Sequence, residues 1–177
     1  MTTLIAPLAD SSLLEGLTVL DLSRNLPGPA CALIFQEMGA KVIKLEPPHG
    51  DDAKSMPMLY NALNSNKTIV TADFRRPEGI QILKDHAAQC DVLIEGFRPG
   101  VMAEMGCSYD HLKTLNPKLV MVSITGYGQT GPYSDRAGFG GIGEAMGGWR
   151  YIVGEPDRPP SRMGVSIGDT LTATYGC

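Results

Sequence analysis

The sequence predicts an α/β fold with a mostly parallel sheet that carries helices on both faces. Short apolar runs recur along the chain, and amphipathic segments separate them. Strands that alternate with helices form parallel sheets, because each helix returns the chain to the edge where the next strand starts. The 177 residues, 43% of them apolar and 19% charged, suit one globular domain.

The strands are expected where apolar runs rich in Val, Ile and Leu lie between turn residues. These runs cover residues 17–22, 41–45, 68–74, 91–97 and 118–125. Helices are expected at 29–39, 77–89, 101–106, 109–116 and 169–176. Pro29 and Pro77 are suitable first residues of a helix, and Gly39 is a suitable stop. The segment 46–57, rich in Pro, Gly and Asp, is predicted to be an exposed loop.

The carboxyl ends of the strands are the predicted functional edge, because sheets of this kind bind ligands there. All five ends are rich in glycine, proline or charged residues, at 21–29, 46–52, 72–75, 96–100 and 125–131. Arg75, Arg76, Arg98 and Arg136 belong to this region or follow it, and three of the four lie at or just past a strand end. Together they suit a ligand that bears phosphate.

Composition excludes several classes of protein. The net charge is −4, the pI is about 5.3, and no basic stripe occurs, so nucleic acid is not an expected partner. No apolar run reaches the roughly 18 residues of a membrane span, and the N-terminus is a poor signal peptide. The four cysteines are scattered without a C-x-x-C pair, which favours reduced thiols, no metal site and a cytoplasmic protein.

Two stretches match the dinucleotide pattern G-x-G-x-x-G, at 126–131 and 138–143. That site needs a strand before the pattern and a helix that opens within it. A proline and a turn-like segment follow the first match, and no strand is expected before the second. We therefore interpret these glycines as positions of tight turns or of close backbone approach.

The stretch GVSIGDT offers two candidate nucleophiles, Ser166 and Asp169. Ser166 lies in a G-x-S-x-G pattern, but no strand is expected before it and no histidine follows it, so a serine triad cannot be completed. Asp169 suits the N-cap of the helix expected at 169–176. A carboxylate there can also serve as a covalent nucleophile, with Gly164 and Gly168 leaving room for a bulky substrate. The pattern alone leaves both roles of Asp169 open.

Several longer segments resemble the family III CoA-transferases, the group that contains the formyl-CoA and carnitine CoA-transferases. They are GLTVLDLSRNLPGPACALIFQEMGAKVIKLEPPHGDD, NKTIVTADFRRPEG, CDVLIEGFRPGVMAEMG, SITGYGQTGPYSDRAGF and RMGVSIGDTLTATYG. The resemblance implies an open Rossmann-like fold without a nicotinamide. Residues 16–177 would form the CoA-binding and catalytic domain, after an N-terminal extension at 1–15. Members are about twice as long and form interlaced homodimers, so we expect the chain to be the front part of such a protein.

The resemblance also implies a mechanism, with Asp169 as the nucleophile. Asp169 would attack an acyl-CoA thioester to give a mixed anhydride, and the released CoA would then form an aspartyl-CoA thioester. A small carboxylic acid would enter and leave as the new acyl-CoA, with no permanently bound cofactor. An aspartate of ordinary pKa is ionised at neutral pH, so it needs no partner base. Glycine-rich backbone would supply N–H donors to a developing oxyanion.

CoA contacts are implied at the strand ends already singled out. They are Leu26, Pro27, Ala72, Asp73, Phe74, Arg75, Gly96, Phe97, Arg98, Arg136 and Phe139. Pro47 and Glu104 stand where some members carry a basic residue, so those two contacts are not carried over. Leu26 replaces a glutamine of the formyl-CoA enzyme, which argues against formyl-CoA and oxalate as the substrates.

Two alternatives stay open beside CoA transfer. The α-methylacyl-CoA racemases share the fold, but they carry a histidine base where this chain has Phe139. Without that base, removal of the α-proton lacks one of its two partners, so transfer is favoured. The other alternative is an inactive fragment that only binds CoA or assembles with a partner chain.

Overall fold

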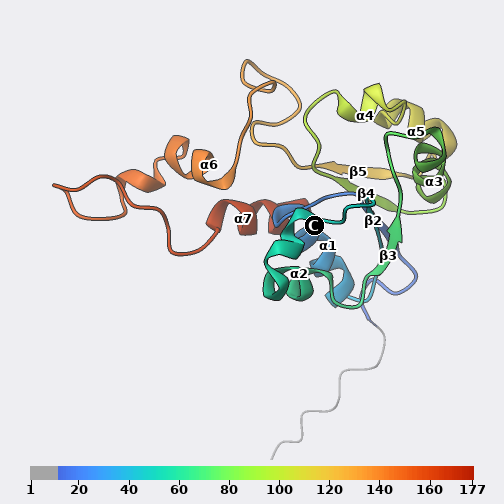
Figure 1. Ribbon diagram of the computed structural model, residues 1–177, viewed down its shortest axis with the longest axis horizontal. Helices are drawn as coiled ribbons and strands as arrows, with labels where there is room; N and C mark the ends of the chain where they lie inside the picture. Colours follow the sequence, from blue (N-terminus) through green and yellow to red (C-terminus); the bar gives the residue numbers. More distant parts are fainter. Residues whose placement is uncertain (1–11) are drawn as a thin grey trace, which may run out of the picture.

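A computed structural model describes residues 12–177 and shows a five-stranded, all-parallel sheet with helices on both faces (Figure 1). The strand order is β3-β2-β1-β4-β5. The strands are β1 Thr18–Asp21, β2 Lys41–Glu46, β3 Thr68–Thr71, β4 Val92–Glu95 and β5 Val120–Ser123. The predicted α/β class is therefore confirmed, although β3, β4 and β5 end earlier than their apolar runs. Residues 1–11 of the expected N-terminal extension lie outside the described residues.

The helices are α1 Pro27–Glu37, α2 Pro57–Asn64, α3 Pro77–Ala87, α4 Val101–Glu104, α5 Tyr109–Leu115, α6 Gly140–Met146 and α7 Ile167–Gly176. Two short 3₁₀ turns are η1 Asp52–Ser55 and η2 Trp149–Tyr151. The first three helices all begin at a proline, whose fixed φ suits the first turn and whose missing N–H would have no partner there. None of the described helices has the length and apolar character that crossing a membrane requires.

The sheet buries apolar side chains on both faces, in two cores. Leu20 and Leu93 point to the face that α3, α4 and α5 cover. Val19 and Ile94, their neighbours along the strands, point to the face that α1 and α7 cover. Side chains alternate between the faces of a strand, so two buried faces require the nearly continuous apolar runs seen in the sequence.

A fully buried group of four charges lies at the carboxyl edge of the sheet. Nζ of Lys44 is 3.1 Å from the Asp51 carboxylate and 3.7 Å from that of Asp21. Nζ of Lys67 is 3.1 Å from the Asp21 carboxylate. The side chains of both lysines and of both aspartates are inaccessible to solvent, so each charge depends on its partners.

This network corrects part of the prediction that residues 46–57 form an exposed loop, since residues 48, 49, 52 and 54–57 are exposed as expected but the middle of the segment is not. Gly50, Asp51 and Ala53 are buried, and η1 lies within the segment. Asp51 causes the difference, because its carboxylate pairs with Lys44 and also accepts a 2.9 Å hydrogen bond from the N–H of Ala53. The loop is therefore folded against the sheet.

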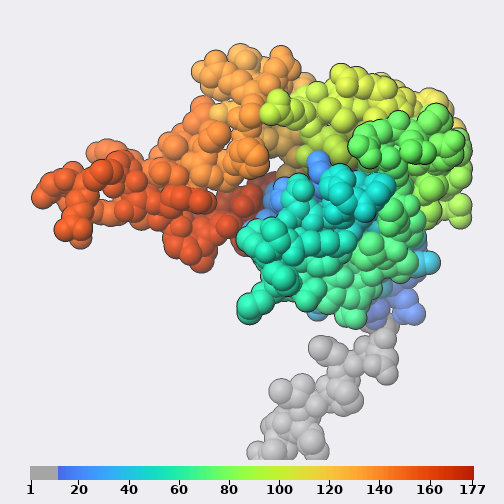
Figure 2. Space-filling view, in the orientation of Figure 1, coloured from blue at the N-terminus to red at the C-terminus, as the bar shows by residue number. Residues whose placement is uncertain are grey.

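The chain leaves the sheet after β5, forms the protruding arm of Figures 1 and 2 with α6, and returns through α7 to pack on α1. Gly126 and Gly138 bring the two ends of the first loop together, because a side chain on either would overlap the backbone of the other. Gly128 and Gly131 adopt positive φ angles of 81° and 98°. The three glycines of the first match and Gly138 of the second thus serve turns and close approach, as predicted, whereas Gly143 of the second match lies inside α6 with open space around it. However, α6 opens at Gly140, where no helix was expected.

Candidate active site around Asp169

Asp169 is the third residue of α7, and Ser166 occupies the N-cap position. Of the two roles left open for Asp169, the N-cap role is therefore excluded, because Ser166 holds that position. The Asp169 side chain is half-buried and lies against Gly140, the first residue of α6. A Cβ at position 140 would stand 3.3 Å from Oδ2 and 3.5 Å from Cγ of Asp169. A side chain at position 140 would therefore crowd the carboxylate, which would have to shift by a few tenths of an ångström.

Burial raises the pKa of the Asp169 carboxyl above its usual value. The positive charge of Arg162 opposes this shift, and the negative charge of Glu144 adds to it. Among residues 12–177, no ion pair holds Asp169. A carboxylate that is poorly solvated and not neutralised by a cation is a more basic, and hence stronger, nucleophile than one on the surface.

A buried glutamate, Glu144 of α6, supports this corner of the structure. Its side chain is 1% exposed and lies 3.5 Å from Nη2 of Arg162 and 3.9 Å from Nε of Arg150. It also accepts a 3.4 Å hydrogen bond from the backbone N–H of Met163. These contacts fasten α6 to the segment that leads into α7. Sequence reasoning missed Glu144, Arg150 and Arg162.

Two of the predicted CoA contacts, Phe74 and Phe97, meet at the carboxyl edge of the sheet. Their rings pack edge to face, with centroids 6.3 Å apart and planes at 79°. The Arg75 guanidinium is held by Asp73 through two hydrogen bonds of 2.8 and 3.0 Å. Ala72 beside them is buried, and its N–H donates to Glu46 of β2. The rings of Phe74 and Phe97 therefore connect the segments after β3 and β4 across the predicted edge, although β2 and β1 lie between these two strands.

The other predicted contacts lie on separate loops. Leu26 and Pro27 are half-buried at the start of α1, and Gly96 is exposed just after β4. The Arg136 guanidinium stacks on the ring of Tyr133, 4.0 Å from its centroid. Phe139 is 76% exposed and immediately precedes the Gly140 that touches Asp169.

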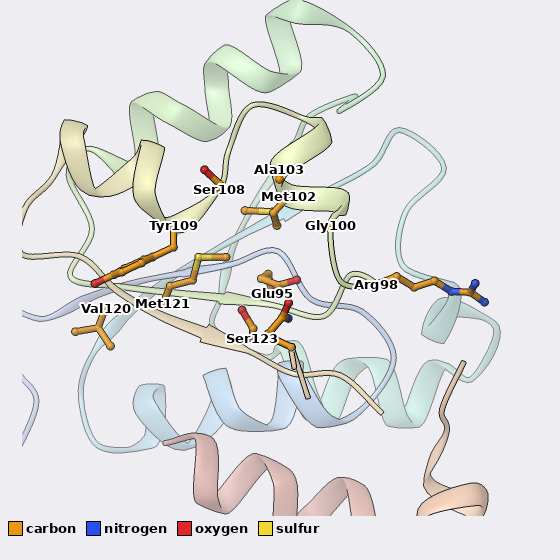
Figure 3. A pocket seen from close by; sticks show the side chains of 11 residues that line it. Glu95, Arg98, Gly100, Met102, Ala103, Ser108, Tyr109, Val120, Met121 and Ser123 are labelled. Carbon is orange, nitrogen blue, oxygen red and sulfur yellow. The ribbon is translucent and has the colours of Figure 1, made fainter. Parts of the chain in front are cut away.

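A cavity of about 530 Å³ opens beside the ends of β4 and β5 (Figure 3). Glu95 and Ser123, paired across the two strands, lie at its floor, and Arg98 extends away from the other labelled side chains. Burial raises the pKa of the Glu95 carboxyl, against the opposing effects of the Ser123 hydroxyl and the Phe97 N–H. Glu95 was not predicted as a site residue, although a carboxylate at the end of an apolar strand is visible in the sequence.

The G-x-S-x-G pattern does not form a nucleophile elbow. In the described part of the chain, a loop after η2 leads into Ser166, and no strand precedes it. This outcome agrees with the sequence analysis and leaves Asp169 as the candidate nucleophile.

Comparison with known proteins decides the family. The chain matches the family model described as CoA-transferase family III over residues 14–177. The chain belongs to CoA-transferase family III. It is 46% identical, over 92% of its length, to the succinyl-CoA–D-citramalate CoA-transferase of Chloroflexus aurantiacus. It is 39% identical, again over 92%, to the human succinyl-CoA:glutarate CoA-transferase.

Solved structures agree with this assignment to family III. A CaiB/BaiF family protein from Brucella suis superposes with a TM-score of 0.89 at 40% identity, covering 92% of this chain and 46% of that one. The chain spans 42% of the Chloroflexus enzyme and 39% of the human one. The described fold therefore corresponds to less than half of each relative.

Proposed function

We propose that the whole protein transfers CoA from an acyl-CoA thioester to a carboxylic acid through a covalent intermediate on Asp169. The observation that carries this proposal is the Asp169 carboxylate itself. It is half-buried, no described cation pairs with it, and Gly140 leaves the space beside its oxygens free. Membership of family III supports transfer chemistry in general.

In the proposed reaction, an Asp169 oxygen attacks the thioester carbonyl, the C–S bond breaks, and CoA thiolate leaves. The product is a mixed anhydride between Asp169 and the acyl group. CoA thiolate then attacks the Asp169 carbonyl carbon, which releases the donor acid and leaves an aspartyl-CoA thioester. The acceptor carboxylate repeats these two steps in reverse, so Asp169 returns as a carboxylate and no proton is consumed. Covalent catalysis of this kind divides one difficult exchange into easier steps.

The substrates are proposed to be small dicarboxylic acids, with succinyl-CoA as the donor. The names of the Chloroflexus and human relatives pair succinyl-CoA with D-citramalate and with glutarate. Leu26, which replaces the glutamine of the formyl-CoA enzyme, supports an acceptor other than oxalate.

CoA is proposed to bind along the strand-end residues of β3 and β4. Phe74 and Phe97 offer aromatic surface, and Arg75 and Arg98 are exposed cations beside them. Guanidinium groups suit the phosphates of CoA. Arg98→Ala should therefore raise the KM for acyl-CoA more than it lowers kcat.

The active form is proposed to be an interlaced homodimer in the cytoplasm. Light scattering of the full-length protein tests whether it is a dimer.

A racemase is not favoured, because the α-methylacyl-CoA racemases carry their histidine base at the position where this chain has Phe139.

The test of function is CoA transfer from succinyl-CoA to a panel of dicarboxylates by the full-length protein. Asp169→Asn should lower the rate at least ~10³-fold, as loss of a nucleophile does. Asp157→Asn, a change at an exposed loop aspartate, should leave the rate unchanged. Exchange of the α-proton in deuterium oxide without transfer would contradict the proposal.

A further inference from the structure

We infer that Glu144 is a positioning residue for the nucleophile, and that it holds Arg150 and Arg162 so that neither guanidinium pairs with Asp169. The inference rests on the proposed function, because it assumes that Asp169 reacts as a free carboxylate. Glu144 is the only charged residue between Arg136 and Arg150 in the sequence, within a segment of glycine and apolar residues.

The burial of Glu144 requires an explanation. A buried carboxylate is costly unless cations and hydrogen-bond donors surround it. Glu144 has both, with Arg162 at 3.5 Å, Arg150 at 3.9 Å and the N–H of Met163 at 3.4 Å. Glu144 is buried, whereas the Arg162 and Arg150 side chains are 60% and 30% exposed, so the carboxylate depends on the arginines more than they depend on it.

Residues in the first turn of α6 lie against both the nucleophile and the two arginines. A Cβ at Gly140 would contact the Asp169 carboxylate, as described above. A Cβ at the next residue, Gly141, would stand 3.4 Å from Nη2 of Arg150 and 3.9 Å from Cζ of Arg162. Asp169 and the two guanidinium groups therefore contact successive residues of the first turn of α6, and the charge of Arg162 acts on Asp169 as well as on Glu144.

Arg162 is the side chain that Glu144 has to restrain. Its side chain is 60% exposed and interacts with both carboxylates, because its charge lowers the pKa of Asp169 while its Nη2 lies at Glu144. Arginine–carboxylate pairs are strong and often engage both oxygens. If Arg162 moved to Asp169, it would cover the attacking oxygens and reduce their basicity. The negative charge of Glu144 keeps Arg162 beside Glu144 and Gly141 and away from Asp169.

A double-mutant cycle in the full-length protein tests this role. Glu144→Gln keeps the shape and the acceptor for Met163 but releases Arg162. We expect kcat, and the rate at which hydroxylamine traps an acylated Asp169, to fall roughly 10- to 100-fold, as a displaced reacting group does. The KM for acyl-CoA should change little. Glu155→Gln, at an exposed loop position, is the matched control and should have no effect.

The decisive variant is Glu144→Gln combined with Arg162→Met, which should recover most of the lost rate because no released arginine remains. A double variant that is as slow as Glu144→Gln, or slower, would overturn the inference. If Glu144→Gln does not fold, Arg162→Met alone still decides. It should fold, raise the pKa of Asp169 and keep a rate within roughly tenfold of wild type, and a larger loss would overturn the inference. Absence of any hydroxylamine adduct on wild-type Asp169 would instead refute the proposed function.

Discussion

Gly140 and Asp169 meet where the first turns of α6 and α7 come together, and Oδ2 of Asp169 lies 3.3 Å from the point where a Cβ of residue 140 would stand. The missing side chain at position 140 thus leaves the carboxylate in a position from which a Cβ would shift it by a few tenths of an ångström. The contact joins the G-x-G-x-x-G match at 138–143 to the GVSIGDT stretch, two motifs between which the sequence shows no connection.

Gly140→Ala should therefore impair CoA transfer. The added methyl group would displace the carboxylate by a few tenths of an ångström, so we expect a loss smaller than the roughly 100-fold that a displacement of about 1 Å can cost. Steady-state kinetics of the full-length protein measure this effect. Gly143→Ala is the matched control in the same helix, because nothing lies within 4 Å of a Cβ there. It should stabilise the protein by up to about 1 kcal/mol and keep full activity. Equal losses in both variants would contradict the account.

The raised pKa of Asp169 predicts a dependence of stability on pH. The folded protein binds the Asp169 proton more tightly than the unfolded chain, so this group favours folding below its usual pKa of 3.8. That advantage is lost as the pH rises through the higher folded-state pKa. Asp169→Asn should therefore raise the melting temperature at pH 7, and the difference should disappear near pH 3. A lower melting temperature of the Asn variant at pH 7 would show that the ionised carboxylate is stabilising.

Lys44→Met should destabilise the fold strongly. It leaves the buried Asp51 without its ion-pair partner, and breaking a buried pair typically costs about 3–5 kcal/mol. Urea denaturation gives the free energy of unfolding. The comparison is Arg24→Met, which removes an exposed ion pair with Asp52, with the two side chains 38% and 63% accessible. That change should cost less than about 1 kcal/mol. Similar costs for both variants would show that the buried network contributes little.

The four cysteines should react in two classes. Burial raises the pKa of the Cys31 and Cys90 thiols to about 12, and it also raises the pKa of Cys107 and of Cys177. Accessibility therefore separates the two classes, because Cys177 is exposed and the other three are buried. Iodoacetamide at pH 8 should label Cys177 first and the other three only after unfolding. Mass spectrometry of the digested protein locates the label, and early modification of Cys31 would contradict the described core.

The sequence predicted the elements whose signals are local. α1 and α3 each start at a proline, and the strands are apolar runs. α2 was missed because its proline lies at the end of a segment rich in loop-forming residues. α6 was missed because its sequence, GGIGEAM, contains three glycines, which disfavour helix. Packing against α7 and the ion pairs of the buried Glu144 stabilise that helix, and such contacts with residues outside the helix leave no local pattern.

The site was predicted to a similar extent. Asp169 was found through its sequence block, and the contact between Phe74 and Phe97 follows from strand ends that share one edge. The pairs of Glu144 with Arg150 and Arg162 join α6 to η2 and to the loop before α7, so their spacing carries no recognisable period. A lone glutamate in a glycine-rich, apolar stretch was the available signal.

The central claim is that Asp169 forms a transient covalent bond with an acyl group or with CoA. The most direct test incubates the full-length protein with succinyl-CoA, adds hydroxylamine, and measures the mass of the peptide that contains Asp169. The account predicts a hydroxamate on Asp169 that appears only when the thioester is present. An unmodified peptide, in a protein that still transfers CoA, would contradict it.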